Sequence, residues 1–141
     1  MIYLIGSLKT TRAREVAKEL RTHNFEVFDD WQATAPDTDK HWEDYERTYR
    51  ERNFREALEG KAAVNNFDFD YRHLLMCDAG VLAAPAGRSA HLELGFILGK
   101  NKPGFILLDG EPQEFDLMYK LATGIFYSVG ELVDELKRRG I

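Results

Sequence analysis

Short apolar runs alternate with longer segments of helical periodicity along most of the chain. The apolar runs predict five strands, at residues 2–5, 25–28, 79–84, 104–108 and 124–127. The segments between them predict helices, because their apolar residues recur on one helical face. These helices are expected at about residues 11–22, 68–77, 90–100, 115–121 and 129–139.

This alternation is typical of a parallel sheet whose strands are joined by crossover helices. Right-handed crossovers and five strands favour an open three-layer α/β sandwich of the flavodoxin-like kind, with strand order 2-1-3-4-5. In such sheets the ligand binds beyond the carboxyl ends of the strands, where the order reverses between the first and third strands. We therefore expect the site to be built from the residues that come directly after the first three strands.

The segment at about residues 31–60 departs from this pattern. It opens with an irregular polar stretch and continues as a charged helical stretch from about residue 41 to residue 59. Four aromatic residues lie among the charges: Trp42, Tyr45, Tyr49 and Phe54. We interpret the segment as an insertion that forms an exposed flap or a surface that meets another subunit. The whole chain, residues 1–141 with this insertion, is expected to form one domain, because 141 residues are enough for one buried core.

Composition narrows the class of function. Hydrophobic residues make up 44% and charged residues 30% of the chain, as in ordinary soluble globular proteins. The net charge of -5 argues against capture of a nucleic acid polymer, so a small-molecule partner is expected. The N-terminus lacks a basic leader and a cleavage site, and no later stretch is long enough to span a bilayer, so we expect no membrane association and a cytoplasmic location.

The single cysteine, Cys77, suggests neither a disulfide nor a metal site. No Cys/His cluster with metal-ligand spacing surrounds it, and we expect a buried structural thiol.

The loops after the first two strands hold few residues suited to ligand binding. Gly6 and Ser7 lie in the loop GSLKTT, which lacks the spacing of a phosphate-binding glycine-rich loop. Either the turn only requires glycine, or its amides and hydroxyl contact a ligand. Asp29, Asp30 and Trp31 come after the second strand, where the acids can cap a helix or close a loop and the aromatic ring can hold a ligand ring.

The stretch PAGRSAHLELG, after the third strand, joins a turn of small residues to an apolar helix that carries a glutamate. Gly87 allows a sharp turn, and Ser89 is the expected N-cap of a helix whose free amides face an anion or a sugar oxygen. Apolar residues surround Glu93, so burial should raise its pKa while the helix N-terminus favours its ionised form. Glu93 is then either a catalytic or ligand-binding residue, or part of a buried ion pair with Arg88. His91 is expected to be structural.

The direction of the helix before the third strand separates two aspartates. This helix must run antiparallel to the strand, so it starts at the carboxyl edge of the sheet. Asp70 can then face the site, whereas Asp78 closes a turn at the opposite edge, and Asp68 is expected to cap the helix. Asp70 and Glu93 together would supply the acid and the nucleophile that cleavage of a glycosidic bond requires.

These residues resemble those of the nucleoside 2-deoxyribosyltransferase family, which includes the 2'-deoxynucleoside 5'-monophosphate N-glycosidases. The similarity covers IYLIGSL at the start, FDFDYRHLLMCDAGVLAAPAGRSAHLELGFILGKNKP in the middle and FDLMY near the end. The resemblance implies a flavodoxin-like fold and a retaining double displacement at the anomeric carbon of the sugar. We expect this catalysis to need no cofactor and no metal.

The resemblance also implies roles for individual residues. Glu93 is the nucleophile that forms a glycosyl-enzyme ester, and Asp70 protonates or hydrogen-bonds the departing base. Tyr3 matches a tyrosine that lies near the nucleophile and the sugar. Asp116 stands where transferases carry an asparagine, in a segment that reaches into a neighbouring subunit's site and contacts the 5' hydroxyl of the sugar. A homo-oligomer, at least a dimer, is therefore expected.

Residues near the expected sugar site bear on the choice between nucleosides and nucleotides. Asp116 should repel a 5'-phosphate, which favours nucleosides. In contrast, Ser7, Lys9, Arg88 and Ser89 could bind a phosphate, as in the N-glycosidase branch. The residues expected to bind substrate are Gly6, Ser7, Trp31, Gly87, Arg88, Ser89 and Asp116.

We therefore expect an enzyme that cleaves the N-glycosidic bond of a (deoxy)nucleoside and passes the sugar to another nucleobase or to water. The alternatives are a hydrolase of nucleoside 5'-monophosphates, a non-catalytic nucleotide sensor, and an enzyme that cleaves a nicotinamide dinucleotide.

Overall fold

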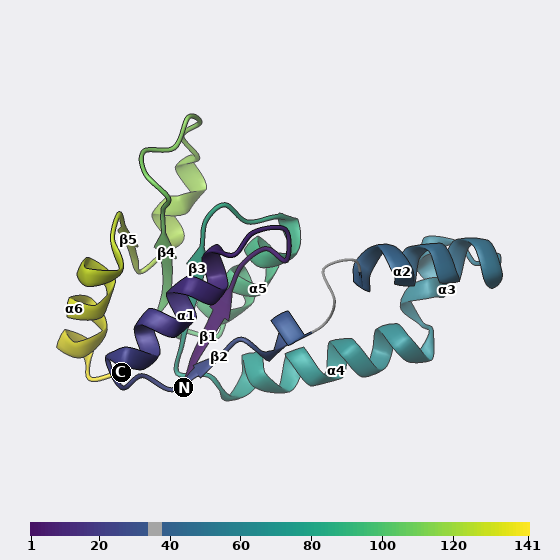
Figure 1. Ribbon diagram of the computed structural model, residues 1–141, viewed down its shortest axis with the longest axis horizontal. Coiled ribbons are helices and arrows are strands. Elements are labelled where there is room, and N and C mark those ends of the chain that lie inside the picture. The colour runs from purple at the N-terminus through teal and green to yellow at the C-terminus, as the bar shows by residue number, and fades with distance from the viewer. Residues whose placement is uncertain (34–37) are drawn as a thin grey trace.

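A parallel sheet forms the centre of the computed structural model, which describes residues 1–33 and 38–141 (Figure 1). The sheet has five strands in the order β2-β1-β3-β4-β5, and every neighbouring pair is parallel. The strands are β1 Ile2–Ile5, β2 Val27–Phe28, β3 Ala79–Ala83, β4 Gly104–Leu107 and β5 Gly124–Phe126. The expected flavodoxin-like α/β fold and its strand order are confirmed.

Helices cover both faces of the sheet and bury a separate core on each. Helices α1 and α6 cover one face, and α4 and α5 cover the other. Their bounds are α1 Arg12–Thr22, α4 Lys61–Met76, α5 Arg88–Gly99 and α6 Val129–Arg139. Successive residues of a strand point to opposite faces, so Leu4 joins the α1/α6 core while Tyr3 and Ile5 join the α4/α5 core. No helix in the described residues is long and apolar enough to cross a membrane.

A helical arm extends beyond the edge of the sheet. It comprises α2 (Thr38–Asp44), η2 (Tyr45–Tyr49), α3 (Phe54–Leu58) and residues 61–68 of α4. Figure 1 shows α2 and α3 beside the far end of α4, away from the strands. One more short element, η1 (Asp30–Ala33), comes directly after β2 and before the arm in the sequence. The buried Glu46 pairs with Arg52, with Oε2 and Nη1 3.2 Å apart. A partly buried ion pair therefore helps to hold the arm together.

Three expected helix starts are wrong. Helix α4 begins at Lys61, because neither glycine nor proline interrupts the segment before Met76, and Asp68 therefore lies inside the helix. Helix α5 has Gly87 as its N-cap, which places Ser89 in the first turn instead of at the cap. The segment expected as a helix at residues 115–121 is the 3₁₀ helix η3 (Leu117–Leu121).

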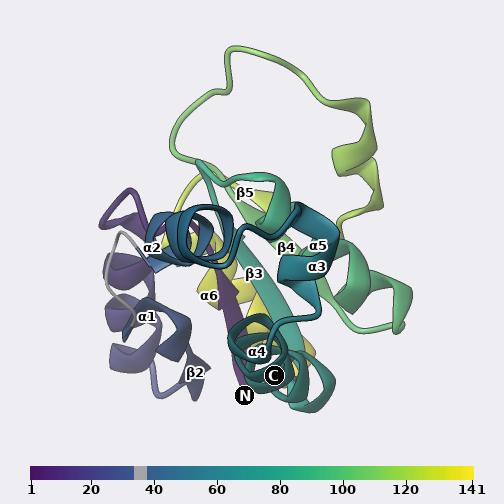
Figure 2. The ribbon, with the colours of Figure 1, turned by 90° about the vertical axis from the view of Figure 1, so that its right-hand side faces the viewer.

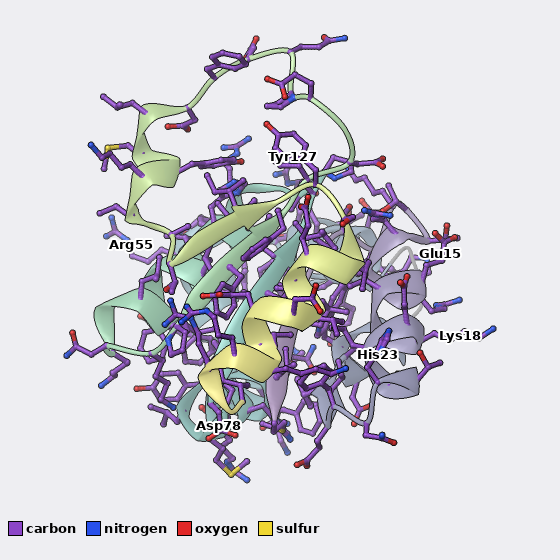
Figure 3. All side chains as sticks on the ribbon, turned by 90° about the vertical axis from the view of Figure 1, so that its left-hand side faces the viewer. Glu15, Lys18, His23, Arg55, Asp78 and Tyr127 are labelled. Atoms are coloured by element: carbon purple, nitrogen blue, oxygen red, sulfur yellow. The ribbon has the colours of Figure 1, made fainter. Side chains whose placement is uncertain are left out.

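The two edges of the sheet differ in the segments that lie beyond the strand ends. At the carboxyl edge, the connection from β4 to β5 arches away from the sheet before it reaches η3 (Figure 2). Tyr127 comes after β5 at this edge, and Asp78 lies at the opposite edge (Figure 3). There the Asp78 carboxylate binds the amino group of Met1 at 2.5 Å. The expectation that Asp78 lies away from the carboxyl edge is confirmed.

Candidate active site

Glu93 lies in the second turn of α5, one helical turn after the buried Ala90 and one before the buried Ile97. Burial raises the pKa of its carboxyl from 4.5 to about 7, and the nearby charge of Asp70 adds to the rise. Arg88 is exposed at the first position of α5, and no ion pair joins it to Glu93. The alternative of a buried Glu93–Arg88 pair is therefore wrong.

Asp70, on α4, lies close enough to Glu93 for the charges of the two carboxyls to interact. Burial raises the pKa of its carboxyl, and the charge of His73, one turn later on the helix, partly opposes the rise. The His73 ring stacks on Phe28 of β2, with ring centroids 3.8 Å apart and ring planes 12° apart. Its Nδ1 donates a hydrogen bond to the carbonyl oxygen of Phe69 at 2.8 Å. His73 thus holds this part of α4 against the edge strand β2.

Tyr3 contributes a hydroxyl from the sheet beneath the two helices. Its side chain is fully buried, and among the described residues its hydroxyl oxygen has no hydrogen-bond partner. The pKa of this hydroxyl is raised by burial first and then by the charges of Glu93 and Asp70. Tyr3, Asp70 and Glu93 therefore interact pairwise, and β1, α4 and α5 bring the three groups together. We call them the acid trio.

The acid trio can supply both an acid and a nucleophile. Two neighbouring carboxyls in a poorly solvated place do not ionise independently, because the first charge opposes the second. Near neutral pH the pair therefore tends to hold one proton. One carboxyl can then donate that proton while the other attacks an electrophile, and the Tyr3 hydroxyl can donate a hydrogen bond to a charged oxygen.

The sequence matches none of the protein-family models and none of the characterised proteins with which it was compared. Support for a function therefore comes from the residues of the chain itself.

The loop after β1 is explained mainly by packing. A Cβ added to Gly6 would lie 2.5 Å from Cβ of Ala13, so α1 can approach this loop only if residue 6 is glycine. The Ser7 hydroxyl accepts a hydrogen bond from the amide of Lys9 at 3.1 Å. Trp31 is partly buried, and its Nε1 donates to the carbonyl oxygen of Leu4 at 2.6 Å. These contacts account for the three residues structurally and leave their expected roles in ligand binding as predictions.

The turn that leads into α5 is open to solvent. Gly87 has an extended backbone with φ -87° and ψ -170°, and nothing lies within 4 Å of an added Cβ. The expectation that a sharp turn requires glycine here is therefore wrong, because other residues adopt this conformation. Arg88 and Ser89 are exposed in the first turn, and no side chain caps the helix. Asp116 is also exposed, and its Oδ1 accepts a hydrogen bond from the amide of Met118 at 2.8 Å.

Two residues of the region were not predicted from the sequence. His73 shares a helical face with Asp70 at a spacing of three residues, and this spacing could have revealed it. Tyr119 contacts His91 across 28 positions of the chain, with a hydrogen bond of 2.9 Å between Nε2 and the hydroxyl. No local pattern predicts that contact.

Cys77 lies beside the acid trio as a structural residue. Its side chain is buried, and Sγ donates a weak hydrogen bond to the carbonyl oxygen of Leu74 at 3.2 Å. Burial raises the pKa of the thiol, which keeps it in its unreactive neutral form. The expectation of a buried structural thiol is confirmed.

Apart from the acid trio, we looked for possible metal sites and cavities among the described residues. No three His, Cys, Asp or Glu side chains in residues 1–33 and 38–141 lie close enough together to hold a metal ion. Two open cavities of about 380 Å³ each lie in the helical arm. The wall of the second contains Glu46 of η2, Arg52 of the connection between η2 and α3, and Lys61 of α4. Neither cavity is lined by a member of the acid trio.

Proposed function

We propose that the protein cleaves the N-glycosidic bond of a (deoxy)nucleoside through a covalent glycosyl-glutamate intermediate. The sugar then passes to another nucleobase or to water. The observation that carries this proposal is the acid trio, in which two half-buried carboxyls and a buried phenol from three separate elements interact electrostatically. The resemblance of the same residues to the nucleoside 2-deoxyribosyltransferase family supports it independently of their geometry.

In the first half-reaction, the Glu93 carboxylate attacks the anomeric carbon of the nucleoside. The bond between this carbon and the base nitrogen breaks, and its electron pair leaves with the base. Asp70, in its protonated form, transfers its proton to the departing base. Burial raises the pKa of Asp70, which favours its protonated form. The products are the free base and a glycosyl ester of Glu93.

In the second half-reaction, an acceptor base or a water molecule attacks the anomeric carbon of the ester. The Asp70 carboxylate removes the proton of the acceptor, and the ester bond breaks to regenerate the Glu93 carboxylate. The Tyr3 hydroxyl donates a hydrogen bond to the carboxylate or to the sugar. Two displacements at one carbon retain its configuration.

One observation favours nucleoside 5'-monophosphates as the substrate. Arg88 is exposed in the first turn of α5, where free amides also point outward, and it has no acidic partner among the described residues. A guanidinium beside a helix N-terminus suits a phosphate. A monophosphate hydrolase is therefore our second candidate.

A substrate panel tests both candidates. The protein is incubated with nucleosides and with their 5'-monophosphates, each with and without an acceptor base, and free or exchanged base is measured by chromatography. We expect turnover that falls at least about 1,000-fold in Glu93→Ala, because the nucleophile is lost. Glu19→Gln, which alters an exposed glutamate on α1, serves as the control and should keep full activity.

The outcomes of the panel separate the candidates. Dependence on an acceptor base indicates transfer, and release of base only from monophosphates indicates the hydrolase. Full activity in a folded Glu93→Ala variant contradicts the proposed nucleophile. If no compound is turned over but one raises the melting temperature, the protein is a nucleotide sensor.

A further inference from the structure

His91 links two segments that both flank the candidate site. Its Nδ1 lies 2.7 Å from the carbonyl oxygen of Gly87, the N-cap of α5. A carbonyl oxygen only accepts hydrogen bonds, so Nδ1 carries the hydrogen. In the neutral ring Nε2 is then an acceptor, and it receives the hydroxyl hydrogen of Tyr119 at 2.9 Å. One imidazole therefore binds the start of α5 and the 3₁₀ helix η3 together.

The contact between His91 and Tyr119 also involves their rings. The ring centroids are 5.7 Å apart and the ring planes 22° apart, so the two rings are stacked. Tyr119 is partly buried against the α4/α5 core. Its ring is held by packing, and its hydroxyl is held by His91.

Tyr119 is in turn close to Asp116. The Asp116 side chain caps η3, and its charge adds to the rise that burial causes in the pKa of Tyr119. The amide of Tyr119 also donates to the carbonyl oxygen of Asp116 at 3.2 Å. A continuous set of contacts thus runs from Gly87 through His91 and Tyr119 to Asp116.

Among the described residues, few other contacts hold the connection before η3, residues 109–116, to the rest of the molecule. Every residue from 109 to 118 is exposed except Pro112, which is half-buried. One further contact holds it near its start, where the Tyr127 hydroxyl donates to Glu111 at 2.8 Å. The position of Asp116 therefore depends on how η3 is anchored, by the contact between His91 and Tyr119 and by the hydrogen bonds between Thr123 and Gly104.

We propose that His91 is a positioning residue, which through Tyr119 holds the segment carrying Asp116 at a fixed place relative to the first turn of α5. The consequence for substrate binding rests on the proposed function and on the expected contact of Asp116 with the sugar in a neighbouring subunit's site. The claim that His91 and Tyr119 hold this segment in place does not depend on any reaction.

Hydrogen exchange tests whether the contact between His91 and Tyr119 holds the η3 segment in place. Tyr119→Phe removes the hydroxyl and keeps the ring, so the fold should be retained. We expect exchange of the amides of Met118, Tyr119 and Ala122, all hydrogen-bonded within the η3 segment, to become about five- to tenfold faster, as the loss of one hydrogen bond implies. The exposed Tyr49→Phe should leave these amides unchanged. Unchanged exchange in Tyr119→Phe overturns the proposal, whatever the activity.

Kinetics test the consequence for binding. We expect Tyr119→Phe and His91→Asn each to raise KM about five- to tenfold while kcat changes by less than about twofold, because both variants free the segment and leave the acid trio intact. His91→Asn retains a donor for Gly87 but is too short to reach Tyr119. In an Asp116→Ala background, Tyr119→Phe should cause no further rise in KM.

The results distinguish a failure of this inference from a failure of the proposed function. A further rise in KM in the Asp116→Ala background shows that Tyr119 acts by another route and overturns the positioning role of His91. If the wild-type protein turns over no nucleoside or nucleotide, the proposed function fails, and hydrogen exchange alone then decides for or against the link.

Discussion

Glu93 occupies a position on α5 where the packing of the helix calls for an apolar side chain. Its helical neighbours Ala90, Leu94 and Ile97 are buried in the α4/α5 core. Burial raises the pKa of Glu93 to about 7, so the ionised form costs free energy in the folded protein. A residue that weakens the fold in this way is expected at a functional site, where reactivity is gained at the expense of stability.

The stability of the protein should report this cost through its dependence on pH. The folded protein binds the Glu93 proton more tightly than the unfolded chain does, so this group lowers the free energy of unfolding as the pH rises from 4.5 to about 7. Glu93→Gln removes the effect. We expect the variant to be more stable than the wild type by about 2–3 kcal/mol at pH 8 and nearly equal to it at pH 4. Urea unfolding at both pH values measures the difference, and equal stabilities at pH 8 would contradict the burial of an ionisable Glu93.

The placement of Asp70 depends on where α4 ends, and a single lysine secures that end. Lys102, which precedes β4, donates hydrogen bonds from Nζ to the carbonyl oxygens of Leu75 and Cys77 at 2.6 and 2.7 Å. Carbonyl groups at a helix C-terminus lack partners within the helix, and a positive charge there also interacts favourably with the helix dipole. Lys102 therefore joins the end of α4 to the chain that enters β4.

Lys102→Met should lower the free energy of unfolding by about 1–2 kcal/mol, because two hydrogen bonds from a charged donor are lost while the aliphatic part is kept. Chemical denaturation measures the change. Lys18→Met is the matched control, because Lys18 is exposed on the outer face of α1 (Figure 3). Equal effects of the two substitutions would show that the contacts of Lys102 do not stabilise the end of α4.

Many of the large apolar side chains that are exposed in the described residues fall into two groups along the chain. Those of the helical arm are Tyr45, Tyr49, Phe54, Leu58, Val64 and Phe67. Those of η3 and its approach are Phe115, Leu117, Met118 and Leu121. Both groups lie outside the two cores, and exposed apolar areas of this kind mark surfaces of association. They support the prediction of a homo-oligomer in which the segment of Asp116 reaches a neighbouring subunit.

Mixed subunits test that prediction. At a substrate concentration near the wild-type KM, Glu93→Gln and Asp116→Ala should each have little activity alone, because the first lacks the nucleophile and the second binds substrate weakly. Sedimentation should show both as oligomers. If Asp116 acts in its neighbour's site, a dimer with one subunit of each variant contains one intact site. An equal mixture, after exchange of subunits, should then recover about one quarter of the wild-type activity. A mixture no more active than the mean of its components contradicts action across an interface, as does sedimentation as a monomer.

The sheet and its strand order could be predicted from the amino-acid sequence, because they result from short-range patterns and from rules of chain connection. The apolar runs are long enough to mark each strand, and right-handed crossovers leave few orders possible. The last helix matches its expected bounds, Val129–Arg139, since a Ser128 cap and Gly140 with a φ of 72° mark its two ends. Glu93 and Asp70 could be predicted as candidate site residues for a similar reason. A carboxylate within an apolar helix and the direction of a crossover helix can both be recognised from a short stretch of sequence.

The contacts between these elements could not be predicted from the sequence and became visible in the folded molecule. An ion pair between Arg88 and Glu93 was the alternative that the sequence allowed, and the structure leaves Arg88 exposed to solvent. The link from His91 to Tyr119 spans 28 residues and has no periodic signal. The burial that raises the pKa of Glu93 and Asp70 comes from the packing of α4 and α5 over β1. Such contacts join segments far apart in the chain, and their free energy depends on the complete packing rather than on neighbouring residues.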